Sequence, residues 1–266
     1  MTSPALRRFD AYIFDLDGTL YVDDELIAGA DETIARLRAD GARVAFVTNH
    51  PLHPATDYAE RLTRLGIPAD PAEIVTSVDA LIRYLGHAHP GSAVLTIAEA
   101  EVRRRLTTAG HALTDDPNAA DVVVVSFDRT FDYAKLLAGY RAVRERGAVI
   151  VATNPDPFCP TRDGGLPDCA AMLAALEACT GARAEAVVGK PSRHMVAAVL
   201  ERLDVAPEAT AVVGDRPATD VAMGQSIGAT GILVLSGATS AAEAAAGDVC
   251  PDHTLDSIRD LIPETR

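Results

Sequence analysis

Short hydrophobic runs and longer amphipathic stretches alternate along almost the whole chain. The hydrophobic runs predict strands at Ala11–Phe14, Arg43–Val47, Glu73–Val75, Ala93–Ile97, Val122–Phe127, Val149–Ala152, Ala186–Val188, Thr210–Val213 and Ile232–Leu235. The amphipathic stretches predict helices at Asp31–Ala39, Ala55–Leu65, Ala98–Ala109, Asp132–Arg146, Ala170–Thr180, Arg193–Leu203 and Ala218–Ile227. Regular alternation of strand and helix indicates parallel sheets covered by helices, and therefore an α/β fold.

Glycines mark the ends of most of the predicted helices. A residue in the left-handed conformation commonly ends a helix, and we expect this role for Gly41, Gly66, Gly110, Gly147, Gly181 and Gly228. The Ala-rich stretch near Ser240–Gly247 predicts a short surface helix rather than a linker. Helix ends can thus be read along most of the chain.

The domain organisation is indicated by two segments that interrupt this pattern. A chain of 266 residues is long enough for two modest domains or one large one. The stretch Gly86–Gly91 predicts a hinge, and Gly181–Glu185 predicts a return crossing. We therefore expect an inserted α/β domain at residues 86–184, and a core domain formed by residues 1–85 and 185–266.

Composition excludes several classes of function. A net charge of −14 argues against a nucleic-acid-binding surface, which would be basic. No signal peptide is recognisable, and aliphatic stretches such as Val122–Val125 are too short to cross a bilayer. The four cysteines form no C-x-x-C pair and suit a reducing compartment. We expect a cytoplasmic protein with no nucleic-acid or membrane partner.

Polar side chains follow four of the predicted strands at the point where each strand ends. They are Asp15 and Asp17 with the turn residue Gly18, then Thr48 with Asn49 and His50, then Lys190, and finally Asp215 with Asp220. Buried carboxylates are costly unless they bind something, and ligands of open α/β sheets bind outside these strand ends. Any one of these residues could simply cap a helix, but the four sets together indicate one site.

The two aspartates of the first strand end suit phosphoryl transfer. The Asp15 carboxylate can act as the nucleophile and form an acyl phosphate that water then hydrolyses. Asp17 lies two residues further along an extended chain and points to the same side. It can therefore protonate the leaving oxygen and later deprotonate water.

The remaining strand ends supply charge neutralisation. Attack of an anion on a phosphate dianion calls for a cation, and oxygen ligands suit Mg²⁺. Asp15, Asp215 and a main-chain carbonyl near Asp17 would form the Mg²⁺ shell, with Asp220 orienting ligands or waters. Lys190 and the hydroxyl of Thr48 would hold the phosphoryl oxygens.

The four sets occur in the order of the four motifs of the haloacid dehalogenase (HAD) superfamily, which the chain resembles over nearly its whole length. The resemblance implies a Rossmann-like parallel-sheet core that uses Asp15, Asp17, Thr48 and Lys190 in catalysis. It also implies that Asp15, Asp17, Asp215 and Asp220 hold the metal. The long spacer between Thr48 and Lys190 is similar to that of the type IIA subgroup, which includes NagD-like and 4-nitrophenylphosphatase-like enzymes. That subgroup carries an inserted α/β cap of the C2 type.

The resemblance extends to a loop of the inserted domain. The segment Ala152–Pro160, followed by Asp163-Gly-Gly and Leu166-Pro167, looks like the substrate-specificity loop of the subgroup. The implied substrate-binding residues are Gly18, Asn49, His50, Asn154, Asp156 and Cys159. For His50 we weigh contact with the leaving group against an ordinary loop position, and for Cys159 substrate contact against a buried thiol.

The sequence departs from the subgroup at two places. Asp168-Cys169-Ala170 stands where the subgroup often has small residues, and His50 stands where Asn or Tyr is commoner. Neither departure removes a catalytic group, but because of both the identity of the substrate does not follow from the resemblance. Glycerol phosphate, phosphoglycolate, a sugar phosphate and a nucleoside monophosphate are all compatible with the sequence.

We therefore expect a Mg²⁺-dependent phosphatase of small phosphorylated metabolites. A phosphotransferase or mutase that uses the same Asp15 nucleophile is one alternative, and a catalytically silent ligand-binding homologue is another. A dinucleotide-binding oxidoreductase is disfavoured because no G-x-G-x-x-G follows the first strand. Caps of this type often mediate dimers in the subgroup, so a homodimer through the cap is a further expectation.

Overall fold

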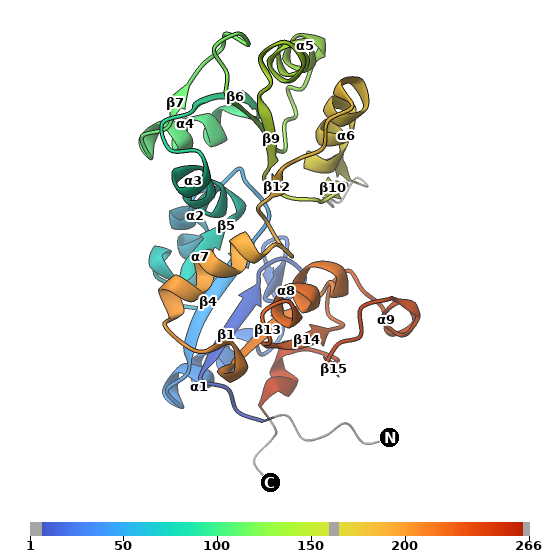
Figure 1. The fold of residues 1–266 in the computed structure, drawn as a ribbon. Helices are drawn as coiled ribbons and strands as arrows, with labels where there is room; N and C mark the ends of the chain where they lie inside the picture. The colour runs from blue at the N-terminus through green and yellow to red at the C-terminus, as the bar shows by residue number, and fades with distance from the viewer. Residues whose placement is uncertain (1–6, 160–164, 263–266) are drawn as a thin grey trace. The chain divides into compact units, whose positions relative to one another are not determined.

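The computed structural model describes residues 7–159 and 165–262, and the chain divides into two compact units (Figure 1). The first unit contains the described parts of residues 1–48, 55–75 and 195–266. The second contains Asn49–Pro54 and Thr76–His194. The predicted insertion, 86–184, lies inside the second unit, which extends about ten residues further at each end.

The first unit is built on a six-stranded sheet with the strand order β15-β14-β13-β1-β4-β5. Its strands are β1 (Ala11–Asp15), β4 (Arg43–Thr48), β5 (Ile74–Thr76), β13 (Thr210–Gly214), β14 (Thr230–Val234) and β15 (His253–Leu255). The pairings from β15 through β4 are all parallel. Figure 1 colours β1 and β4 blue and β13 to β15 orange to red, so this sheet joins the two ends of the chain.

Hydrophobic side chains bury both faces of this sheet. Phe14, Phe46 and Val213 belong to one core cluster, together with Ile34 and Leu62 from two helices. The alternate strand residues are also buried, as expected of a parallel sheet with both faces covered. The helices of this unit are α1 (Ala30–Ala39), α2 (Ala55–Arg64), α7 (Arg193–Leu203), α8 (Ala222–Gln225) and α9 (Ala241–Ala246). Arg193 and His194, the first two residues of α7, are assigned to the second unit.

Shorter elements complete the first unit. A hairpin of β2 (Tyr21–Val22) and β3 (Glu25–Leu26) follows β1. Single 3-10 turns lie at Pro71–Glu73, Pro207–Ala209 and Ile258–Leu261. A π-helical segment, Pro217–Val221, precedes α8. It follows β13 closely, and therefore lies at the carboxyl edge of the sheet.

The second unit has a five-stranded parallel sheet with the order β12-β9-β8-β6-β7. Its strands are β6 (Ala93–Ile97), β7 (Ala112–Leu113), β8 (Val122–Val125), β9 (Val149–Ala152) and β12 (Ala186–Val187). Its helices are α3 (Ser77–Ala88), α4 (Ala100–Thr108), α5 (Tyr133–Arg141), which continues as a π-helical segment (Ala142–Arg146), and α6 (Cys169–Thr180). A separate antiparallel hairpin pairs β10 (Phe158–Cys159) with β11 (Leu166–Pro167).

The α/β class predicted from the sequence is confirmed. All six glycines expected to end helices have φ between +72° and +99°. The Ala-rich stretch forms the short helix α9, none of whose residues is buried. The sequence pattern missed α3, because Gly86 and His87 were assigned to a hinge and instead lie in its last turn.

Two expectations from composition can be compared with the structure. None of the four cysteines, all of which lie in the described residues, takes part in a disulfide. None of the helices in residues 7–159 and 165–262 combines the length and the hydrophobicity that a bilayer span requires.

The second unit contains an almost fully buried aspartate. The side chain of Asp128 is 0% exposed and accepts hydrogen bonds from Lys135 Nζ at 2.6 Å and from the Thr130 hydroxyl at 2.7 Å. The Thr130 main-chain N–H also donates to it, at 3.0 Å. This carboxylate therefore ties the loop after β8 to the first turn of α5.

We expect Asp128→Ala to lower the free energy of unfolding by about 2–3 kcal/mol, because hydrogen bonds to a charged group are lost. Asp115→Ala is the matched control: the Asp115 side chain is 85% exposed and pairs with Arg103 at 3.0 Å. Loss of such a surface pair costs less than about 1 kcal/mol. Urea denaturation of both variants tests the difference, and equal losses would contradict it.

Candidate active site

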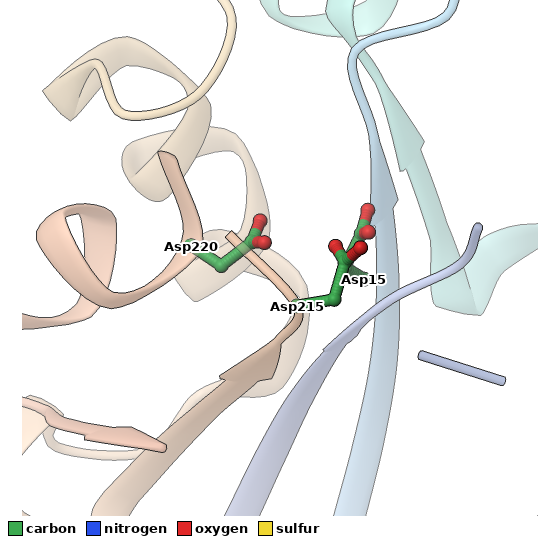
Figure 2. Close-up of side chains that lie close together, drawn as sticks. All are labelled: Asp15, Asp215 and Asp220. Atoms are coloured by element: carbon green, nitrogen blue, oxygen red, sulfur yellow. The ribbon is translucent and has the colours of Figure 1, made fainter. Parts of the chain in front are cut away.

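Three aspartates of the first unit bring their carboxylates together at the carboxyl edge of its sheet (Figure 2). Asp15 is the last residue of β1, Asp215 directly follows β13, and Asp220 lies in the π-helical segment. One oxygen from each lies within 4.8 Å of the other two, and the residues are only 8%, 2% and 1% exposed. The parallel pairing of β1 with β13 brings the first two together, because both strands end at the same edge.

Asp215 is held in place from two other loops. Its Oδ2 accepts a hydrogen bond from the main-chain N–H of Ala238 at 2.6 Å. A Cβ atom added to Gly18 or to Gly237 would overlap the Asp215 carboxylate. Gly18 also has φ +82°, a backbone conformation that residues other than glycine rarely adopt. Glycine at these two positions therefore leaves the room that the Asp215 carboxylate occupies.

Asp220 is fixed by its own segment of chain. Its Oδ2 accepts a hydrogen bond from the main-chain N–H of Arg216 at 3.0 Å, at the start of the π-helical segment. A Cβ atom on Gly214 would overlap the Asp220 side chain. The last residue of β13 therefore has to be small for Asp220 to reach the other two carboxylates.

The other predicted residues of the first unit lie near these strand ends. Asp17 is exposed and forms an isolated bridge with Tyr21, just after β1. Its carboxylate is outside the group of three, and the metal-binding role expected at Asp17 stays a prediction. Thr48 is the buried last residue of β4, one residue beyond the Val47 that pairs with Asp15.

The three carboxylates fit a divalent cation. Like charges this close repel one another strongly where water is excluded, and a cation removes that cost. Carboxylate oxygens are hard ligands, which suit Mg²⁺ or Ca²⁺ better than the softer transition metals. The glycines at 18, 214 and 237 keep open the space that the carboxylates need.

The remaining predicted residues belong to the second unit, where four of them form one hydrogen-bonded network. The Asn49 side chain contacts both the Lys190 main chain and the Asp156 carboxylate. Asn154 is fully buried and donates through Nδ2 to the Asn49 carbonyl at 3.2 Å. Its Oδ1 accepts from the main-chain N–H of Asp156 at 3.0 Å. The side-chain oxygen and nitrogen of Asn154 are thus both engaged within the unit.

The sequence matches the family of haloacid dehalogenase-like hydrolases over residues 12–112, and the HAD-hydrolase-like family over residues 187–261. A glycerol-3-phosphate phosphatase from Gallus gallus is 34% identical over an alignment 290 residues long, gaps included, which covers 97% of this chain and 92% of the relative. The chain belongs to the haloacid dehalogenase-like hydrolases.

Solved structures of the family agree with this assignment. A p-nitrophenyl phosphatase from Archaeoglobus fulgidus has a TM-score of 0.90 at 30% identity, covering 96% of this chain and 98% of that one. A glycerol phosphate phosphatase from Mycobacterium tuberculosis, solved in complex with calcium, has a TM-score of 0.86 at 30% identity, covering 95% of this chain and 74% of that one. The resemblance drawn from the motifs is confirmed: the chain is a HAD hydrolase that acts on phosphoric monoesters.

The two departures from the family pattern have local structural roles. Asp168 caps α6 by accepting the N–H of Cys169 at 2.5 Å. The Cys169 thiol donates to the Val125 carbonyl at 3.4 Å, and burial raises its pKa to about 11. His50 stacks on His53 with ring centroids 5.7 Å apart, and lies 5.9 Å from the Phe127 ring. Asp168 therefore caps a helix, Cys169 is part of the hydrophobic core of the second unit, and His50 is anchored within the same unit.

The hairpin β10–β11 contains only part of the predicted specificity loop. Cys159, the last residue of β10, pairs with Leu166 and is half-buried. The neighbouring Phe158 is exposed. Pro160 and Asp163 of the predicted loop lie outside the described residues. Substrate contact by Cys159 and by His50 stays a prediction.

The sequence pattern missed the loop after β14. Ser236 donates from its hydroxyl to the Gly18 carbonyl at 2.9 Å, and Ala238 donates to Asp215. Gly237 between them approaches the Asp215 carboxylate closely. The only local signal was a Ser-Gly pair directly after a predicted strand, which is also typical of ordinary turns.

Gly214→Ala should displace Asp220, because the added methyl group overlaps its carboxylate. We expect the rise in melting temperature caused by a saturating divalent cation to be largely lost in this variant. Gly86→Ala is the matched control, since nothing lies within 4 Å of a Cβ there and the residue is inside α3. That control should keep the full rise, and an equal rise in Gly214→Ala would contradict the role of Gly214.

Proposed function

We propose that this hydrolase is a Mg²⁺-dependent phosphatase of small phosphomonoesters, with Asp15 as the residue that carries the phosphoryl group. The observation that supports it most directly is the convergence of Asp15, Asp215 and Asp220 within 4.8 Å, with Asp17 exposed two residues beyond Asp15. A purely structural aspartate cluster would be a cost without a compensating gain.

Asp15, Asp215 and Asp220 would hold Mg²⁺, together with the main-chain carbonyl of Asp17. When bound, the cation neutralises charge on the carboxylate nucleophile and on the phosphoryl oxygens. Its ligands would all be oxygens, as Mg²⁺ prefers, and the calcium bound to the mycobacterial relative supports an oxygen-liganded divalent cation.

The chemistry would proceed in two steps. In the first, an Asp15 carboxylate oxygen attacks phosphorus, the bond from phosphorus to the ester oxygen breaks, and Asp17 gives that oxygen its proton. In the second, Asp17 takes a proton from water, whose oxygen attacks phosphorus and releases inorganic phosphate from Asp15. Asp17 regains its proton, so each turnover consumes one water.

Positioning would account for the rest of catalysis. The Thr48 hydroxyl and the Lys190 ammonium would bind the phosphoryl oxygens, which offsets locally the overall charge of −14. The second unit would act as the cap that excludes water and large phosphoproteins, which favours a small metabolite as substrate. A homodimer through this unit stays a prediction.

Asp15→Asn should abolish hydrolysis of p-nitrophenyl phosphate, lowering kcat by about 10⁴-fold or more, since loss of a nucleophile removes the covalent route. Mass spectrometry after acid quench should find one phosphoryl group on the wild-type enzyme and none on the variant. Asp10→Asn, at the exposed opposite end of the same strand region, is the control and should keep activity. Full activity in Asp15→Asn would overturn the mechanism. Release of less inorganic phosphate than p-nitrophenol when a sugar acceptor is added would indicate a phosphotransferase instead.

Removal of one carboxylate should separate stability from metal binding. In EDTA we expect Asp220→Asn to melt at the same temperature as the wild type or higher, because one of three repelling charges is gone. Mg²⁺ should raise the melting temperature of the wild type but not of this variant. Asp248→Asn, on an exposed position, controls for the change in net charge. An unchanged response to Mg²⁺ in Asp220→Asn would contradict the assignment of the metal site.

A further inference from the structure

The Asn49 side chain holds the main chain of Lys190 through both of its polar atoms. Asn49 Oδ1 accepts the Lys190 N–H at 2.7 Å, and Asn49 Nδ2 donates to the Lys190 carbonyl at 3.3 Å. Nδ2 also donates to Asp156 Oδ2 at 2.9 Å. An amide offers an acceptor and two N–H donors on one plane, and here both donors are engaged.

Asn49 is itself anchored. Its main-chain carbonyl oxygen accepts hydrogen bonds from the Ser77 hydroxyl at 2.7 Å and from Asn154 Nδ2 at 3.2 Å. Asn49 is buried, and a Cβ atom on Gly189 would lie 2.5 Å from its Oδ1. The network therefore joins Asn49 to residues 28, 105 and 141 positions further along the chain. It also leaves no room for a side chain at the residue before Lys190.

We propose that Asn49 is a positioning residue that fixes the Lys190 main chain, and through it the place of the Lys190 ammonium, rather than a residue that binds substrate. This inference rests on the proposed function, in which that ammonium binds the phosphoryl oxygens. A lysine has a flexible stem, so the position of its charge depends on where the main chain is held. A misplacement of about 1 Å can lower a rate about 100-fold.

A double-mutant cycle on kcat/KM for p-nitrophenyl phosphate tests this. We expect Asn49→Ala to lower kcat/KM about 100-fold, and Lys190→Ala to lower it about 10²- to 10³-fold. The double variant should fall no further than Lys190→Ala alone, because Asn49 acts only through Lys190. The inhibition constant of inorganic phosphate should follow the same pattern. Asn118→Ala, an exposed asparagine of the same unit, should leave all these values unchanged.

The outcomes are distinguishable. If Lys190→Ala keeps full activity, the proposed role of Lys190 fails, and the inference fails with it. If both single variants lose activity and the losses multiply in the double variant, Lys190 keeps its role but the positioning inference is overturned. A merely structural role of Asn49 would give that multiplied loss, because it would not depend on the side chain at 190.

A swap variant keeps the test valid if Asn49→Ala does not fold. Asn49→Asp preserves the size and the acceptor for the Lys190 N–H, but places a second carboxylate against Asp156. We expect it to lose activity, and Asn49→Asp combined with Asp156→Asn to recover part of it. In the swap the hydrogen bond to residue 156 re-forms with its direction reversed and the acceptor for the Lys190 N–H is kept, whereas the donor to the Lys190 carbonyl is lost. Failure of the swap to raise kcat/KM above that of Asn49→Asp would overturn the inference.

Discussion

Three aspartate carboxylates of the first unit lie within 4.8 Å of one another, and buried like charges at such a separation repel strongly. The sheet imposes this arrangement, because β1 and β13 are parallel neighbours that end at the same edge. Main-chain N–H groups of Arg216 and Ala238 then hold two of the carboxylates in place. Most of the local geometry at this edge, including its glycines, follows from the need to keep the carboxylates together.

Such a site costs stability, and the hydrophobic core of the same unit offsets that cost. Phe14 and Phe46 on adjacent strands are fully buried directly beside the polar edge, with Val213 on the other neighbouring strand. A binding cation returns part of the lost free energy, which links metal binding to folding. A strong core beside a repulsive group of charges is typical of functional sites, where local stability is exchanged for chemistry.

The boundary between the two units passes through the polar ends of strands. Thr48 belongs to the first unit and the adjacent Asn49 to the second, and the division between Val75 and Thr76 falls inside β5. The segment Asn49–Pro54 leaves a strand of the first unit and is anchored in the second by Asn49 and His50. Predicted site residues are thus distributed over both units.

Local sequence was enough to predict the α/β alternation, the glycine ends of the helices and the strand ends that carry Asp15, Asp215 and Lys190, because periodicity and motif spacing are local properties. It was not enough for α3, since Gly86 and His87 resemble a hinge unless the helix packs against a core. Nor could it show that Gly237 lies against the Asp215 carboxylate, or that the Asn49 side-chain amide forms hydrogen bonds with the main chain of Lys190. Those contacts join residues from 22 to 141 positions apart, and only the folded topology decides which of many compatible partners meet.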